Sequence, residues 1–414
     1  MKKIRQPRIR GLVLKVASRC NLNCSYCYVY NQGDTTYRDQ PFLMTNATVE
    51  LLISRVNDYC RQYRIRAFRF VFHGGEPLLA PVSFYHQFVS QVERVLPAHT
   101  RVEYTLQTNG VLLTDDWCRA LGELGVRIGI SIDGPAAVHD AFRVDHRGRG
   151  SYAAAVAGLR RAQTHLALRY HPGVLVVIDP TTQPEAFLEH FARIDVKTLN
   201  LLLPDGTHHK LPPHCRPDEM RTPYGDWLIR LFDAWFLLPY TTRVRIRFFQ
   251  QIINLILGFA ETTEAIGQTH ALFLVIETDG SIEAEDSLKV CKSGITKEGM
   301  HLRTHSLVSS LAAPLIAQCA NSHQTLPTAC QCCPIRRVCG GGVLLHRYHP
   351  ANGFDNPSVY CRDLLKLITH IQNQILAVLP PSLLAETGVR PLSYEQVLTM
   401  LNERGNQRKV GLVE

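Results

Sequence analysis

The chain has 414 residues, of which 45% are hydrophobic and 20% are charged. That composition excludes a disulfide-stapled mini-protein and a disordered chain, and it predicts a sizeable core in two or three domains. The formal charge of +9 is mild and its basic residues are dispersed, so we expect no nucleic-acid partner. We find neither a signal-peptide pattern nor an apolar run near the roughly 20 residues of a membrane span. We therefore expect a soluble, cytoplasmic protein without a membrane partner.

From residue 11 to about 203, short β-branched runs alternate with amphipathic stretches. The predicted strands are 11–17, 68–72, 102–106, 126–132, 173–178 and 199–203. The predicted helices between them are 45–63, with Thr45 as its N-cap, 81–96, 114–124, 151–165 and 184–193. Six strand-helix units predict an α/β fold with a parallel sheet and right-handed crossovers. We expect a partial (β/α)6 TIM-like barrel rather than a closed eightfold one.

After residue 203 the pattern changes to a long loop, 204–222, followed by helices over 223–237 and 248–259. Asp279-Gly280 between two alternating runs predicts a hairpin. A cysteine-rich loop region, 319–361, precedes a helix over 361–379, and a short helix with a tail follows. The predicted domains are a core barrel (1–203), a helical bridging region (204–270), a cysteine-bearing domain (271–379) and a C-terminal tail (380–414).

Three cysteines, Cys20, Cys24 and Cys27, follow the first predicted strand, where α/β barrels place their chemistry. The 13 cysteines of the chain are an odd number and lack a secretory context, which argues against a disulfide framework. Three thiolates on one loop would leave one iron of a four-iron cluster open, whereas structural zinc normally takes four ligands. The spacing favours the cluster over zinc or simple packing.

This C-x3-C-x2-C loop, with Tyr26 before its last cysteine, resembles the signature of radical S-adenosylmethionine (SAM) enzymes. The resemblance implies SAM bound at the open iron, an external electron donor such as a flavodoxin or ferredoxin, and cleavage of SAM to a 5′-deoxyadenosyl radical. It also implies a set of cofactor-binding residues at the ends of successive strands, which are Tyr26, Gly74, Gly75, Glu76, Asn109, Ser131 and Arg143.

Among these residues, the Gly74-Gly75-Glu76 segment would meet the methionine amino group, and Ser131 would contact the nucleoside. Arg143 would pair with the carboxylate of SAM, because a planar guanidinium binds a carboxylate bidentately. Taken one at a time, the Asn109-Gly110 and Asp133-Gly134 pairs are equally explained as turns.

Four further cysteines, Cys330, Cys333, Cys339 and Cys361, complete a closed ligand set. Their spacing alone fits zinc as well as iron and sulfur. Together with the first triplet, they resemble the SPASM extension of peptide-modifying radical enzymes, which implies two 4Fe-4S clusters in all. Cys332 falls between ligand positions and is expected to be a bystander.

The sequence departs from the fuller SPASM pattern in two places. Val343 stands where a cysteine is expected, and the predicted hairpin carries Glu283-Ala284-Glu285-Asp286 without one. The comparison implies that the first auxiliary cluster has lost its ligands. Cys291 and Cys319 are the possible substitutes, but their surroundings do not match.

Two subfamilies compete for the remaining resemblance, which covers residues 11 to about 375. The segments 106–118 and 131–145 are similar to anaerobic sulfatase-maturating enzymes, which form formylglycine. A second group of segments resembles three-residue cyclophane-forming maturases of ribosomal precursor peptides. These segments are 15–31, 276–280, 286–289, 339–342, 346–348 and 353–361. In that group the 5′-deoxyadenosyl radical removes a β-hydrogen, the carbon joins an aromatic ring, and the ring loses one electron and one proton.

The cyclophane interpretation is the one we favour, and formylglycine or thioether formation is the alternative. Asp286 matches the catalytic aspartate of the sulfatase-maturating enzymes, and we name it as the base; an aspartate closing a hairpin or pairing with Lys289 explains it equally well. Only 19 residues precede Cys20, so we expect no fused leader-binding domain at that end. A non-enzymatic zinc or iron-sulfur interaction protein is the remaining alternative.

Overall fold

The computed structural model describes residues 9–216, 220–263, 265–270, 272–382, 384 and 390–401. These residues form two compact units. Within the described residues, the first unit contains 9–177, 190–202 and 272–320. The second unit contains the described residues of 178–189, 203–270 and 321–401. The four-part division stays a prediction, and parts of the predicted 204–222 loop and 380–414 tail lie outside the described residues.

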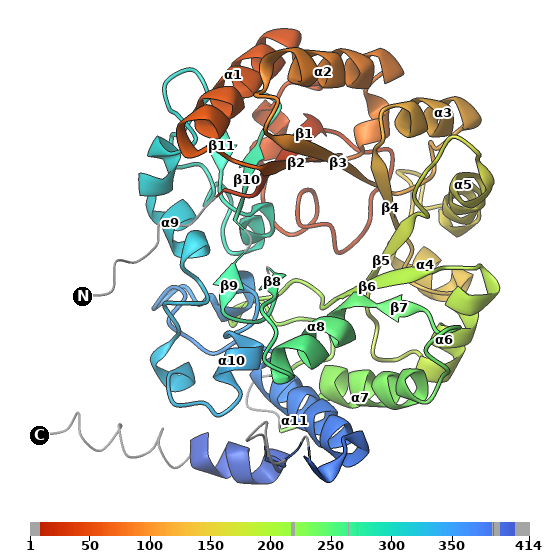
Figure 1. Cartoon of the computed structure of the whole chain (residues 1–414), viewed down its shortest axis with the longest axis vertical. Helices are drawn as coiled ribbons and strands as arrows, with labels where there is room; N and C mark the ends of the chain where they lie inside the picture. The colour runs from red at the N-terminus through yellow and green to blue at the C-terminus, as the bar shows by residue number, and fades with distance from the viewer. Residues whose placement is uncertain are drawn as a thin grey trace, which may run out of the picture. The chain divides into compact units, whose positions relative to one another are not determined.

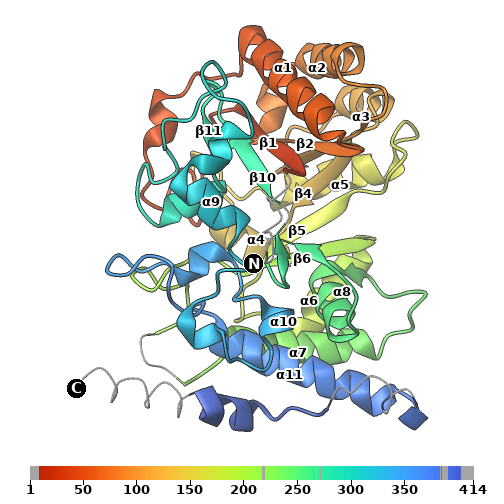
Figure 2. The same ribbon diagram turned by 60° about the vertical axis from the view of Figure 1, so that its left-hand side comes forward.

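The first unit is built on an open sheet whose strand order is β11-β10-β1-β2-β3-β4-β5-β6. The strands are β1 (Gly11–Ala17), β2 (Ala67–Gly74), β3 (Arg101–Thr108), β4 (Arg127–Ser131), β5 (Gly173–Val177), β6 (Thr198–Leu202), β10 (Phe273–Ile276) and β11 (Ile282–Glu283). The strands from β10 to β6 pair in parallel, and only β11 runs antiparallel, to β10. The predicted parallel α/β architecture is therefore confirmed. The predicted hairpin at Asp279-Gly280 joins β10 and β11, and Figure 2 shows β10 alongside β1.

Helices lie along the outer side of this sheet (Figure 1). They are α1 (Asn46–Tyr63), α2 (Val82–Val95), α3 (Asp115–Glu123) and α5 (Tyr152–Thr164). The short helix α4 (Ala136–Phe142) follows β4, and α6 (Pro184–Arg193) follows β5. The Thr45 side chain accepts a hydrogen bond from the Thr48 amide, which confirms the predicted N-cap. Helix α4 is not among the predicted helices, because seven residues are too few to show a helical period.

The two-residue period of β2 explains how the sheet separates its core from its functional face. Phe68, Phe70 and Phe72 are fully buried on one face, where Phe70 meets the Phe88 ring of α2 edge to face at 5.1 Å. Alternate residues such as Val71 and His73 lie on the opposite face. One face of the strand thus holds the helices, and the other presents side chains to the inner side of the sheet.

The second unit contains α7 (Pro223–Phe236), α8 (Arg247–Ile256), α10 (Arg336–Cys339) and α11 (Cys361–Val378). Its short strands are β7 (Arg245–Ile246), β8 (Thr262–Thr263) and β9 (Thr269–His270). Helix α11 packs against α7 and α8. Helix α8 ends three residues before its predicted end, because the chain turns at Gly258, whose φ is +86°.

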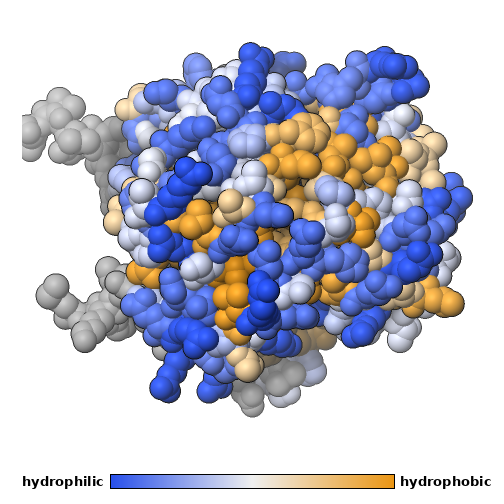
Figure 3. All heavy atoms as spheres, turned by 90° about the horizontal axis from the view of Figure 1, so that it is seen from above, coloured by the Kyte–Doolittle hydropathy of each residue, from blue (hydrophilic) through white to orange (hydrophobic). Residues whose placement is uncertain are grey.

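Among the described residues, we find no helix with the length and apolar character needed to span a membrane. On the face seen in Figure 3, apolar residues gather in several areas separated by hydrophilic ones.

Replacing Phe70 with Ala should lower the free energy of unfolding by about 3–5 kcal/mol, because the change leaves a cavity between β2 and α2. Chemical denaturation followed by circular dichroism would measure the loss. Phe42, which is 54% exposed, provides the control: Phe42→Ala should change the free energy of unfolding by less than about 1 kcal/mol. Equal losses in the two variants would contradict this packing.

Candidate active site

The loop after β1 brings Cys20, Cys24 and Cys27 together. The Cys27 amide donates to the Cys24 carbonyl at 3.0 Å, and this tight turn gathers the last two thiols. All three thiols interact electrostatically. Burial, followed by the Glu76 carboxylate, raises the pKa of Cys20 to about 12; burial raises the pKa of Cys24 to about 11, although Arg143 opposes the rise. A cation bound among them would stabilise their thiolate forms.

The Gly74-Gly75-Glu76 segment lies directly against the start of this loop. The Gly75 amide donates to the Ala17 carbonyl at 2.8 Å, and the Glu76 amide donates to the Arg19 carbonyl at 3.0 Å. A Cβ on Gly75 would come within 2.3 Å of the Arg19 carbonyl oxygen, so no other residue fits there without a shift of the backbone. The glycine pair therefore sets how closely the end of β2 approaches the cysteine loop.

The Glu76 carboxylate joins the ends of β2 and β3. It accepts hydrogen bonds from the Leu78 amide (3.0 Å), the Thr108 hydroxyl (2.7 Å) and the Asn109 amide (2.9 Å). Burial raises the pKa of Glu76 to about 7, and these hydrogen bonds oppose the rise. The Glu76 carboxylate is thus already hydrogen-bonded at the ends of β2 and β3. Its expected contact with the amino group of the methionine part of SAM stays a prediction.

The Asp133 carboxylate connects the cysteine loop with β4, β5 and α4. It accepts hydrogen bonds from the Tyr26 hydroxyl, from Arg143 Nε at 2.9 Å and from the Val177 amide at 3.1 Å. Arg143 Nη1 also lies 4.0 Å from the Cys24 sulfur. From the sequence, Asp133 is predicted only as part of a turn. Arg143 pairs with Asp133, and its predicted contact with the carboxylate of SAM stays a prediction.

Two further predicted residues have different surroundings. The Asn109 side-chain amide donates to Asn21 Oδ1 at 2.8 Å and lies 3.8 Å from the Cys20 sulfur, so Asn109 belongs to the cysteine site. Ser131, at the end of β4, accepts a hydrogen bond from the Gln107 side chain at 2.9 Å. That contact lies within the sheet, and the expected contact of Ser131 with the nucleoside of SAM stays a prediction.

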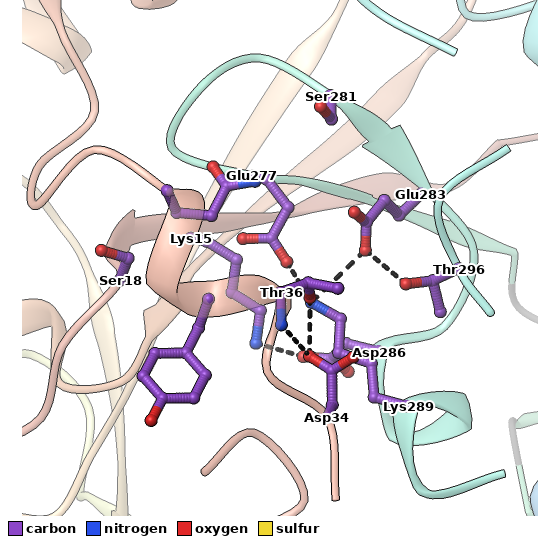
Figure 4. Close-up of polar contacts among 12 residues, drawn as sticks. Lys15, Ser18, Asp34, Thr36, Glu277, Ser281, Glu283, Asp286, Lys289 and Thr296 are labelled. Carbon is purple, nitrogen blue, oxygen red and sulfur yellow. Dashed lines mark hydrogen bonds and ion pairs between the residues drawn. The ribbon is translucent and has the colours of Figure 1, made fainter. Parts of the chain in front are cut away.

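Asp286, the predicted base, lies in an ion pair with Lys15 on the inner face of the sheet (Figure 4). It also accepts a hydrogen bond from the Tyr28 hydroxyl at 2.8 Å. Burial would raise the pKa of Asp286, but the Lys15 ammonium and the His73 ring hold that pKa well below its usual range. Lys15 and His73 are register partners on β1 and β2. Burial and Lys15 lower the pKa of His73 to about 4, while Asp286 opposes this.

Lys289, the partner considered for Asp286 from sequence, instead binds two glutamates of the hairpin region (Figure 4). Its ammonium lies 2.5 Å from Glu277 Oε1 and 3.3 Å from Glu283 Oε2, and the Thr296 hydroxyl donates to Glu283 at 2.6 Å. Lys15, Tyr28 and His73 were not among the predicted site residues. The one available signal was a lysine inside the buried strand GLVLKVA, because buried lysines are normally paired.

In the second unit, Cys330, Cys333, Cys339 and Cys361 form an electrostatically interacting set. Cys361 begins α11 and Cys339 ends α10. Burial raises the pKa of Cys330 to about 11 and of Cys339 to about 12. Cys332 is exposed. In the first unit, Cys319 is buried and interacts electrostatically with Cys291.

Both cysteine sets fit iron-sulfur ligation by their donors. Across the described ranges, no three or more His, Cys, Asp or Glu side chains are placed so that they could hold a single metal ion as they stand. The donor chemistry fits: three thiols on one loop leave a position open on a 4Fe-4S cluster, and four thiols close one.

Comparison with known proteins points to the class. Residues 14–191 match the model of the radical SAM superfamily. A serine-type anaerobic sulfatase-maturating enzyme of Klebsiella aerogenes is 28% identical over 343 residues, covering 81% of this chain and 79% of that protein. The cysteine-type enzyme of Clostridium novyi (strain NT) is 26% identical over 275 residues, covering 66% of this chain and 71% of that protein.

Solved structures show the same fold. Native anSMEcpe with bound AdoMet and Kp18Cys peptide has a TM-score of 0.72 at 21% identity, covering 89% of this chain and 98% of that chain. Streptococcus suis SuiB bound to its precursor peptide SuiA has a TM-score of 0.54 at 12% identity, covering 82% of this chain and 72% of that chain. These matches confirm the radical SAM fold predicted from the sequence, with a C-terminal region consistent with a SPASM-like extension.

Replacing Asp133 with Asn should lower the free energy of unfolding by about 3 kcal/mol, because the Arg143 cation would lose its buried partner. Chemical denaturation would measure the loss. Asp116→Asn is the matched control, since Asp116 forms an exposed ion pair with Arg119; its effect should stay within about 0.5 kcal/mol. Equal effects at the two positions would show that the Asp133 carboxylate does not organise the site.

Proposed function

We propose that this chain is a radical SAM maturase that cross-links side chains of a ribosomal precursor peptide, joining an aromatic ring carbon to a β-carbon. The observation that carries the radical chemistry is the gathering of Cys20, Cys24 and Cys27 beside Asn109 and Arg143. When bound there, a 4Fe-4S cluster supplies the electron that cleaves SAM to methionine and a 5′-deoxyadenosyl radical. The electron would come from an external donor such as a flavodoxin or ferredoxin.

The hairpin region supports the cross-linking assignment. The fuller SPASM pattern places a cysteine in this hairpin, where the chain has residues 283–286 and no cysteine. Glu283 is fully buried there and bound by Lys289 and Thr296. This ionic cluster favours one auxiliary cluster, on the four cysteines of the second unit, over two. When bound, that cluster would supply an electron acceptor for rearomatisation.

On the inner face, Asp286 is the residue proposed to hold the ring proton. Its ion pair with Lys15 keeps it ionised, and the Tyr28 hydroxyl fixes its orientation. To accept a proton, the carboxylate must exchange its contact with Lys15 for one with the substrate.

Formylglycine formation is the second candidate, because several relatives at 24–28% identity are sulfatase-maturating enzymes. It uses the same radical, but the substrate residue would be a Cys or Ser.

Anaerobic reconstitution tests the enzyme class. About eight irons per chain and release of 5′-deoxyadenosine from SAM are expected. Replacing Cys20, Cys24 and Cys27 together with Ala should halve the iron and abolish 5′-deoxyadenosine, while Cys332→Ala, the control, should change neither. Bound zinc without SAM cleavage would support the interaction-protein alternative instead.

Replacing Asp286 with Asn should block cross-linking while SAM cleavage continues, because the amide cannot accept the proton. The measurement is product by mass spectrometry beside 5′-deoxyadenosine by chromatography. Asp279→Asn, on the hairpin turn, is the control and should retain both. Full product formation by the Asp286 variant would exclude this residue as the base.

Tandem mass spectrometry separates the two reactions. A cross-link removes two hydrogens and suppresses fragmentation between the joined residues, whereas formylglycine carries an aldehyde that reacts with a hydrazide probe. We expect the first result with a precursor peptide that lacks Cys and Ser. Hydrazide labelling of a sulfatase-derived peptide, with no change in the precursor, would favour the second candidate.

A further inference from the structure

Arg347 is a buried cation within the region of the four-cysteine set. It ends the short helix Leu344–Arg347, and only 1% of it is exposed. The thiols of Cys330 and Cys339 act on it electrostatically, as does the adjacent His346 ring, and across the described residues no carboxylate forms an ion pair with it. Because a guanidinium keeps its proton in proteins, a full positive charge is held here.

Backbone carbonyls surround this guanidinium. Its Nε donates to Gly341 O at 2.9 Å, and its Nη2 donates to Gly340 O at 2.8 Å and Gly342 O at 2.9 Å. Its Nη1 donates to Ser322 O at 2.8 Å. Four of the five N–H groups are thus satisfied by neutral acceptors.

The same contacts explain the run of three glycines after Cys339. Gly340, Gly341 and Gly342 have φ values of +60°, +80° and +69°, in the left-handed region that residues with a Cβ avoid. This backbone turns three successive carbonyls toward one side chain. A Cβ on Gly341 would also lie 2.7 Å from Arg347 Nη2. The glycines and the arginine therefore form one structural unit beside the thiols.

Carbonyl dipoles satisfy the guanidinium donors but leave its net charge in place. A 4Fe-4S cluster on four thiolates is anionic and gains one more negative charge on reduction, so a nearby buried cation favours the reduced form. We propose that Arg347 is a positioning residue that holds the glycine loop around the auxiliary cluster and raises the reduction potential of that cluster. The inference rests on the proposed function, since it concerns the proposed electron acceptor.

The test uses the full chain with Cys20, Cys24 and Cys27 changed to Ala, so that only the auxiliary iron remains. Arg347→Gln removes the charge but keeps an amide donor, and Arg347→Lys keeps the charge but loses the fork that reaches four carbonyls. Arg337→Gln is the matched control, because Arg337 is exposed beside the same cysteines. Iron content and a redox titration followed by electron paramagnetic resonance are the readouts.

The parent is the triple-cysteine variant that retains Arg347. At its midpoint potential, the ratio of reduced to oxidised cluster should fall at least tenfold in Arg347→Gln, which lowers the reduction potential by about 59 mV for one electron. Arg347→Lys and Arg337→Gln should stay near the parent. Loss of iron in Arg347→Gln that Arg347→Lys restores would also support the inference.

An unchanged potential in Arg347→Gln would overturn the inference, as would an equal shift or a loss of iron in both Arg347 variants. In those cases Arg347 would only anchor the loop. If the parent itself binds no iron, the proposed auxiliary site fails and the inference fails with it, so the two failures are distinguishable.

Discussion

The hydrogen bonds of the buried Asp133 carboxylate are the interaction on which the candidate site depends. Parallel strands bring their ends to one edge of the sheet, but they do not fix the loops that leave that edge. Asp133 does so by accepting from the Tyr26 hydroxyl, from Arg143 and from the Val177 amide, which belong to segments far apart in the sequence. Because the pair is buried, separating either partner would strand a charge, so the cysteine loop is held firmly.

Burial of charge recurs throughout both cysteine regions. Lys15 and Asp286 neutralise each other on the inner face, and Lys289 is bound by Glu277 and Glu283. Arg347 differs, because its donors are met by carbonyls and its charge is left for the thiols. Ion pairs such as that of Lys15 with Asp286 hold side chains in place. A cation such as Arg347, whose donors bind carbonyls, acts instead on the electronic state of a bound group.

Two glycine clusters serve the two cysteine sets in different ways. Gly75 allows the end of β2 to touch the Arg19 backbone, which leaves no room for a Cβ. Gly340 to Gly342 instead supply left-handed backbone that points carbonyls at a cation. In both cases the backbone, rather than a side chain, forms the wall of the cysteine region.

The sequence by itself determined the strands, most helices and the hairpin, because periodicity and caps are local properties. It also predicts the grouping of the cysteines, because ligand spacing is local too. All six predicted strands, the Thr45 cap and the parallel sheet are confirmed. Only the tertiary structure decided the partners of the charged residues. Asp286 meets Lys15 rather than Lys289, Arg143 meets Asp133, and Glu76 joins the ends of β2 and β3. These pairs join residues that sequence spacing does not relate, since the register and the inward face of each strand bring them together.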